Sequence, residues 1–303
     1  MKNYILYAVT YMLLCFSSIW AMENVPLHIY AIPGQNGLGS SELYIKGLLN
    51  GEDIKVHQVE TPKFFPDLGQ YRCMSYLGKK LNAQEAEPGI IIATSQGTAT
   101  ALNSAGDEKI RGLILEAVLA SGNDAIIHTL KGPLANQSRF TNLPLSYYWL
   151  PYVVKLVFPC YWPAGKQPIK SIADIPNDKP IVIVHSERDP QLSYEGACAL
   201  YYGLCAQGNV NTYLISKNDN RHIDICSGKD GEVIKAILRK HKLLPYGITE
   251  ENVDLNAYRP DFKQFKALYD SLISKEKKHD YIKNSFLASC FVWLGYFTRN
   301  YIG

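Results

Sequence analysis

GIIIATSQGTATALNSAG, residues 89–106, passes from a short apolar run through a single serine into small residues that suit a helix. The run GIIIAT is almost continuously apolar, which is typical of a central parallel strand buried on both faces. Ser95 stands at the corner between this strand and the helical segment that follows. The stretch therefore predicts a strand, a sharp turn at Ser95 and a helix.

Strands and helices alternate on both sides of this stretch. Further strand-like segments cover residues 26–32, 53–60, 110–119, 179–190 and 210–216, and further helical patterns cover residues 42–50, 67–82, 193–205 and 231–244. Such alternation is the signature of a mostly parallel sheet with helices on both faces. We therefore predict an α/β fold, with Ser40 or Ser41 as the N-cap of the first helix.

A long insertion and a tail add to this core. Aromatic residues and prolines crowd the stretch LSYYWLPYVVKLVFPCYWPAG, residues 145–165. The whole interruption, residues 120–179, is long for a connection without a strand, which favours a functional lid, with core packing of a cap as the alternative. We assign an α/β domain to residues 22–246, including this lid, and a C-terminal helical extension to residues 247–303.

Both ends of the chain raise the question of membrane contact. Residues 1–21 combine Lys2, a long apolar stretch and Ala21. That order is typical of a secretory signal, with an uncleaved anchor or a core helix as alternatives. A signal or an anchor would place the body outside the cytoplasm, as a secreted, periplasmic or membrane-anchored protein. The apolar run 285–297 is too short to span a bilayer, and we expect it to dock on the body or lie in a membrane interface.

Composition limits the classes of partner. The 303 residues are 47% apolar and 19% charged, with a formal net charge of +3. Such a chain can bury a large core but has no strongly basic face for nucleic acid. Cys15 lies in the N-terminal segment, and the other six of the seven cysteines permit either disulfides or buried thiols. Neither metal-ligand spacing nor a dinucleotide fingerprint is present, so the sequence predicts no metal and no cofactor.

The position of Ser95 suits nucleophilic chemistry. A serine hydroxyl becomes a useful nucleophile when a base takes its proton and donors hold the oxyanion that forms. A sharp strand-to-helix turn pushes the side chain out at the carboxyl end of the sheet and aims the next backbone N–H at the same place. Only small residues fit two positions before and after such a serine, and here they are Ala93 and Gly97.

The pentapeptide ATSQG resembles the nucleophile elbow G-x-S-x-G of the α/β-hydrolase family, with Ala93 in place of the first glycine. The resemblance spans roughly residues 26–244 and implies a serine hydrolase whose partners follow in the order serine, acid, histidine. Asp189, directly after an apolar strand, resembles the acid of this family, and His222 lies in the loop after the last strand. The resemblance therefore implies Ser95, Asp189 and His222 as the catalytic residues.

The same resemblance implies an oxyanion hole. The loop IPGQNGLGSS, after the first strand, has Pro33 where relatives often carry histidine and Gly34 where they carry glycine. By position, the two donors are then the backbone N–H groups of Gln35 and Gln96.

Other acids and histidines compete for roles in this site. Glu116, at the end of a strand, and nearby Asp124 are alternatives for the acid. The residues for which we expect structural roles, in the histidine loop or inside strands, are Asp219, Asp224, His28 and His185.

Taken together, these features predict a serine hydrolase that acts on carboxylic esters, with a small-molecule or lipid ester of an apolar acyl group as its substrate. The aromatic insertion is apolar enough to cover an acyl-binding cleft. Thioesterases and peptidases use the same triad, and the fold does not separate them. A hydrolase-like scaffold that binds a lipid or a partner without turnover is the alternative from a different class.

Overall fold

The computed structural model describes residues 26–34, 39–60, 68, 70–83, 86–134, 151–152, 161–226, 228–244 and 253–281. The N-terminal segment, Gln35, the centre of the aromatic insertion and the apolar run 285–297 lie outside these ranges. Export, the lid and membrane contact therefore stay predictions. Within the described ranges, no helix has the length and apolar character needed to cross a bilayer.

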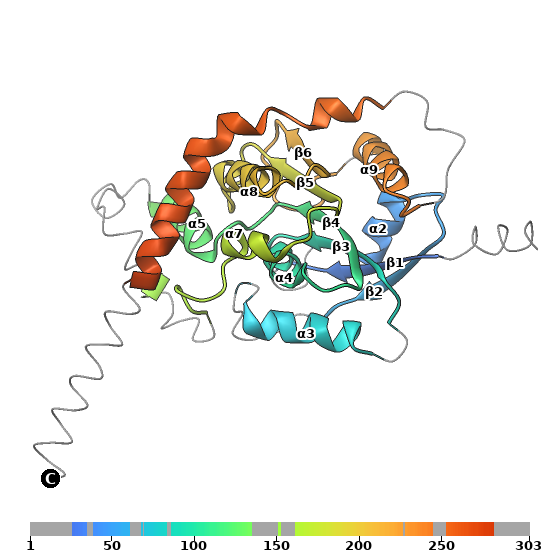
Figure 1. Ribbon diagram of the computed structural model, residues 1–303, viewed down its shortest axis with the longest axis horizontal. Coiled ribbons are helices and arrows are strands. Elements are labelled where there is room, and N and C mark those ends of the chain that lie inside the picture. The colour runs from blue at the N-terminus through green and yellow to red at the C-terminus, as the bar shows by residue number, and fades with distance from the viewer. Residues whose placement is uncertain are drawn as a thin grey trace, which may run out of the picture.

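Six parallel strands form the central sheet, in the order β2-β1-β3-β4-β5-β6 (Figure 1). The strands are β1 (Leu27–Ile32), β2 (Ile54–Gln58), β3 (Gly89–Thr94), β4 (Ile110–Glu116), β5 (Ile181–Ser186) and β6 (Thr212–Lys217). Helices cover both faces of this sheet. The predicted α/β fold class, a mostly parallel sheet between helical layers, is therefore confirmed.

The inner strands are apolar along their whole length because each face of the sheet is covered. In β3, Ile91 and Ala93 belong to one apolar core, whereas Ile90 and Ile92 belong to the other. Successive side chains of a strand point to opposite faces, so both sets must be apolar when both faces are buried.

The helices are divided between the two faces as the order of the strands requires. Helices α3 (Tyr71–Leu81), α4 (Gln96–Ser104) and α8 (Tyr194–Ala206) cover one face, and α2 (Glu42–Leu48) and α9 (Gly228–Lys240) cover the other (Figure 1). Helix α2 begins after Ser41, whose hydroxyl accepts the Tyr44 N–H at 3.2 Å. Ser41, one of the two expected candidates, is thus the N-cap.

The chain departs from the predicted elements around the insertion. Strand β4 ends at Glu116, three residues before the predicted end, because Ala117 has a φ of 50° that turns the backbone out of the sheet. The insertion then begins with a helix that the sequence pattern did not indicate. The described elements of the insertion are α5 (Gly122–Leu134), α7 (Pro168–Ser171) and the 3-10 helix η2 (Ile172–Asp174).

Strand order also indicates where a ligand would bind. The chain runs from β1 to β2 on one side and then crosses to β3 on the other side of β1. Open parallel sheets bind ligands outside the carboxyl ends of their strands at such a reversal. Ser95, directly after β3, lies at this point.

The C-terminal extension is helical over its described part, as predicted. It comprises η3 (Leu255–Tyr258), η4 (Phe262–Phe265) and a helix over residues 266–281. Figure 1 shows this segment in red, running over α8 toward α5. Leu272 is buried in the same apolar core as β3 and α8, so the extension packs on the body of the protein.

Candidate active site

Ser95 occupies a strained turn between β3 and α4. Its φ of 53° and ψ of −123° fall outside the usual regions for a residue with a side chain, at a cost of about 1–3 kcal/mol. The Ser95 N–H donates to the Glu116 carbonyl at 2.9 Å, and the Ser95 carbonyl accepts the Thr98 hydroxyl at 2.6 Å. These bonds hold the turn and present a partly exposed serine side chain at the carboxyl end of β3.

Gly97 lets the start of α4 pass close to the end of β1. A Cβ on Gly97 would lie 2.4 Å from the Ile32 carbonyl oxygen and 2.6 Å from that of Pro33. Real Cβ atoms do not approach backbone this closely, and the backbone at the end of β1 cannot easily move away. The requirement for a very small residue two positions after Ser95 is therefore a packing requirement.

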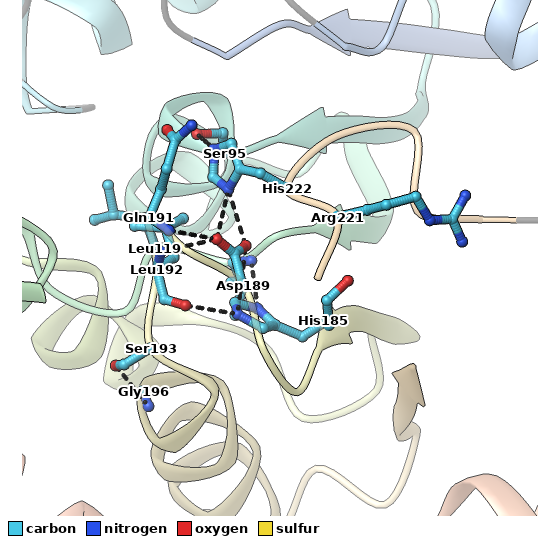
Figure 2. Close-up of polar contacts among 12 residues, drawn as sticks. Ser95, Leu119, His185, Asp189, Gln191, Leu192, Ser193, Gly196, Arg221 and His222 are labelled. Carbon is cyan, nitrogen blue, oxygen red and sulfur yellow. Dashed lines mark hydrogen bonds and ion pairs between the residues drawn. The ribbon is translucent and has the colours of Figure 1, made fainter. Parts of the chain in front are cut away.

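His222 reaches Ser95 from the loop that follows β6. Its Nε2 lies 2.8 Å from Ser95 Oγ, although 127 positions separate the two residues (Figure 2). The imidazole is only 11% exposed. Carboxyl ends of parallel strands meet at one edge of a sheet, which is how two distant loops bring these side chains together.

Asp189, in the loop after β5, lies on the other side of the imidazole. His222 Nδ1 is 2.9 Å from Asp189 Oδ1 and 2.8 Å from Oδ2. The backbone N–H groups of Gln191 and Leu192 also donate to Oδ1, at 2.7 and 3.0 Å. Burial by itself would raise the pKa of Asp189, but these hydrogen bonds and His222 outweigh it and lower the pKa.

This carboxylate determines how the imidazole is protonated. An ionised carboxylate only accepts hydrogen bonds, so the facing Nδ1 of His222 carries a proton. In the neutral imidazole Nε2 is then an acceptor, and it is directed at the Ser95 hydroxyl. A serine hydroxyl that donates to a neutral histidine, itself oriented by an acid, can be deprotonated as it attacks an acyl carbonyl.

The loop that carries His222 is closed by the neighbouring arginine. Arg221 Nε donates to Asp219 Oδ2 at 2.9 Å, and its terminal nitrogens donate to the carbonyls of Asp224 at 3.0 Å and Ile225 at 2.8 Å. Figure 2 shows the Arg221 side chain extending away from Ser95. Asp219 and Asp224 thus accept hydrogen bonds from Arg221 that hold the loop in its conformation.

The two alternative acids lie elsewhere. Asp124 Oδ2 accepts the Ser193 hydroxyl at 2.6 Å, in front of α8. Glu116 is 2% exposed and accepts hydrogen bonds from Tyr44 and Thr94. Within the described ranges, Asp189 is the acid that contacts the imidazole of His222.

Of the two expected oxyanion donors, Gln96 lies within the described residues. Gln96 is the first residue of α4, where backbone N–H groups have no partner within the helix, and its side chain is buried. Its N–H therefore follows Ser95 without a partner in α4, and its role as an oxyanion donor stays a prediction. Gln35 lies outside the described residues.

Two further histidines lie beside Asp189, in the loop that follows β5. His185, at the end of β5, is fully buried, and its Nε2 is 3.8 Å from Asp189 Oδ2. Its Nδ1 accepts the Val118 N–H at 3.0 Å, and burial lowers the pKa of His185, so the ring is neutral. His128 Nε2 lies 3.1 Å from the Asp189 carbonyl oxygen. The strand pattern indicated a structural role for His185 but not its proximity to the acid, and it gave no signal for His128.

The described side chains form neither a metal centre nor a disulfide. In the described part of the chain, no three histidine, cysteine, aspartate or glutamate side chains are placed to share a metal ion. No disulfide joins the cysteines of that part. Burial raises the pKa of Cys226, in the histidine loop, well above its ordinary value, so this thiol stays protonated.

Comparisons with known proteins give distant structural likenesses. No protein-family model matches the sequence, and neither does any curated protein at a significant level. An esterase from Pyrococcus furiosus is 15% identical with a TM-score of 0.48, over 72% of this chain and 84% of that one. Est1E from Butyrivibrio proteoclasticus is 17% identical with a TM-score of 0.48, over 73% and 89%. An acylaminoacyl peptidase from Pyrococcus horikoshii is 13% identical with a TM-score of 0.48, over 78% and 40%. Likenesses this distant say nothing of the chemistry of this chain.

Proposed function

We propose that this protein is a serine hydrolase that cleaves carboxylic esters through an acyl-enzyme formed on Ser95. The observation that carries the proposal is the hydrogen-bonded path from Ser95 Oγ through His222 to Asp189, with 2.8 Å contacts on both sides of the imidazole. The strained turn at Ser95 supports it, because such outliers persist where the surrounding structure holds a functional group in place.

Acylation begins with proton transfer from Ser95 to His222. As Oγ forms a bond to the ester carbonyl carbon, Nε2 takes the hydroxyl proton, and the Asp189 carboxylate stabilises the charged imidazole. The carbonyl oxygen becomes an oxyanion, which the N–H of Gln96 can hold, with that of Gln35 as the second donor implied by the family resemblance. Each such donor is typically worth roughly 3 kcal/mol in the transition state.

Collapse of the tetrahedral intermediate breaks the bond between the carbonyl carbon and the leaving oxygen. His222 gives its proton to that oxygen, and the alcohol departs. A water molecule then attacks the acyl group while His222 takes its proton, and the acid is released as the proton returns to Ser95. No co-reactant besides water is needed.

We favour esters of apolar acyl groups, from small molecules or lipids, as substrates. The aromatic insertion at residues 145–165 supports this choice, since its side chains suit the wall of an acyl-binding cleft. Thioesters and peptides can react by the same steps, so substrate class requires measurement.

A substrate panel and an active-site probe test the proposal together. We expect p-nitrophenyl esters to be hydrolysed, with preference for longer acyl chains, faster than a thioester or an aminoacyl amide. A fluorophosphonate probe should label the protein, and Ser95→Ala should abolish labelling and turnover while the thermal midpoint is retained. Folded protein that is neither labelled nor active would instead support a binding scaffold without turnover.

A further inference from the structure

Glu116, the last residue of β4, is a buried acid that the proposed mechanism does not use. It lies beside the residue before the nucleophile, because the register of β3 and β4 pairs Thr94 with Glu116. Its side chain is almost fully removed from water, at 2% exposure. A carboxylate in such a place is costly unless hydrogen bonds satisfy it.

One set of contacts joins Glu116 to the nucleophile turn. The Glu116 backbone carbonyl accepts the N–H of Ser95 at 2.9 Å, and its side-chain Oε2 accepts the Thr94 hydroxyl at 3.1 Å. The Thr94 hydroxyl also lies 2.6 Å from that of Ser40, in the loop that leads from β1 to α2.

A second set joins the same side chain to the loop of His222. Oε1 accepts the backbone N–H of Ile225 and, at 3.0 Å, that of Cys226. Tyr44, on α2, donates its hydroxyl to the same oxygen at 2.5 Å. Burial is the largest effect that raises the pKa of Tyr44, so the phenol stays protonated and remains a donor.

The segment that follows His222 is thereby held by two contacts at Ile225. The Ile225 carbonyl accepts a hydrogen bond from the Arg221 guanidinium, and the Ile225 N–H donates to the Glu116 carboxylate. His222 lies in the chain between Arg221 and Ile225, the two residues that the first of these contacts joins. An acid that is hydrogen-bonded both to the turn at Ser95 and to the loop that carries His222 can set the distance between them.

We infer that Glu116 is a positioning residue, which ties the end of β3 to the His222 loop so that Ser95 Oγ and His222 Nε2 meet at hydrogen-bond distance. This inference rests on the proposed function and adds a role that the triad does not contain. Glu116 acts through Thr94, Ile225 and Cys226, and its carboxylate serves as an acceptor for their donors.

The test compares Glu116→Ala and Glu116→Gln with a matched control. Glu52→Ala is the control, because Glu52 is also a buried carboxylate, 8% exposed and paired with Arg239, but precedes β2 at the opposite end of the sheet. With p-nitrophenyl butyrate, Glu116→Ala should lower kcat on the order of 10- to 100-fold and leave KM within about threefold, as expected for misplaced catalytic groups. Labelling by the fluorophosphonate probe should slow to a similar extent.

The remaining two variants separate positioning from stability. Glu116→Gln should recover most of the lost kcat, because its amide oxygen can still accept from Ile225 and Cys226. Glu52→Ala should lower the thermal midpoint and leave kcat unchanged. Wild-type kcat and labelling in a folded Glu116→Ala protein would overturn the inference.

Hydrogen exchange supplies a readout that does not depend on turnover. In Glu116→Ala the amides of residues 221–226 should exchange faster, whereas Glu52→Ala should leave them unchanged. If the wild type shows no labelling or turnover, the proposed function fails, and exchange alone then decides whether Glu116 holds the loop.

Two smaller changes keep the test decisive if Glu116→Ala does not fold. Thr94→Val and Tyr44→Phe each remove one hydroxyl from Glu116 without opening a large cavity. Each should lower kcat about fivefold, the effect of one ordinary hydrogen bond. Unchanged kcat and unchanged exchange at residues 221–226 in both variants would overturn the inference.

Discussion

Asp189 meets His222 with both carboxylate oxygens, at 2.9 and 2.8 Å from Nδ1. The same acid receives the backbone N–H groups of Gln191 and Leu192, so its position does not depend on the histidine alone. Such an acid can impose one orientation and one tautomer on the imidazole.

Asp189→Asn should therefore retain the fold and lose activity. The amide would present an N–H group to Nδ1, which favours the tautomer whose Nε2 cannot accept the Ser95 proton. We expect kcat for p-nitrophenyl esters to fall by on the order of 10³- to 10⁴-fold. Asp124→Asn is the control, because the Asp124 carboxylate accepts a hydrogen bond from the Ser193 hydroxyl rather than from His222. Activity in Asp189→Asn and loss in Asp124→Asn would reassign the acid.

Gly97→Ala tests the close approach of α4 to β1. The added Cβ would meet two backbone carbonyl oxygens, at 2.4 and 2.6 Å, and we expect a loss of about 1–3 kcal/mol in the free energy of unfolding. The shifted turn should also lower kcat. Gly78→Ala is the matched control, since it lies within α3 and nothing lies within 4 Å of its Cβ position. It should raise stability by about 0.5–1 kcal/mol. Urea unfolding measures the free energy of unfolding of both variants. A Gly97→Ala protein as stable as the wild type would contradict the proposed close packing of α4 on β1.

The sheet was predictable because its strands are buried on both faces. Strand β3, Gly89–Thr94, coincides with its predicted residues, as expected for an apolar run bounded by a proline before it and a serine after it. The proximity of Ser95, Asp189 and His222 follows from the same pattern. Each follows a parallel strand, and these strands end at one edge of the sheet.

Other features depend on packing that no local pattern records. The sequence of α5, GNDAIIHTLKGPL, contains two glycines and a proline, so its helix signal is weak. Glu116 and Asp189 both stand at or just after strand ends, and the family resemblance favoured Asp189 as the acid with Glu116 as an alternative. Their contacts distinguish the two acids, because Glu116 accepts from backbone N–H groups and hydroxyls, whereas Asp189 contacts the imidazole of His222.

The buried imidazole of His185 should make stability depend on pH. Burial lowers its pKa below the ordinary 6.5, against the opposing effect of Asp189. The unfolded chain then takes up a proton near pH 6.5 that the folded chain does not, so its contribution to stability is present above that pH and is lost as the pH falls.

His185→Gln should reduce this dependence. The amide can still accept the Val118 N–H and donate to the Leu192 carbonyl, as the imidazole does. We expect the thermal midpoint to fall less between about pH 7 and about pH 5 in the variant than in the wild type. Other histidines with lowered pKa values keep part of the slope in both proteins. Calorimetric curves with equal slopes would show that His185 is not responsible.

The C-terminal extension should contribute to stability through one buried acid. Glu276, on the helix over residues 266–281, is fully buried and accepts the Ser121 hydroxyl at 2.5 Å and the Asn123 amide at 2.9 Å, at the start of α5. Removing the carboxylate in Glu276→Ala deprives two buried donors of an acceptor, which costs about 1–3 kcal/mol of unfolding free energy. The loosened helix should also become more sensitive to limited proteolysis.

Asp270→Asn is the control for this change, because Asp270 lies on the same helix but pairs with Lys266 at the surface. It should change neither the urea midpoint nor the proteolysis pattern, since exposed ion pairs contribute little. The extension packs closely elsewhere too, where a Cβ on Gly203 of α8 would lie 2.7 Å from the ring of Tyr269. If Glu276→Ala unfolded at the same urea concentration as the wild type, that apolar packing on α8, rather than the contact with α5, would account for the docking.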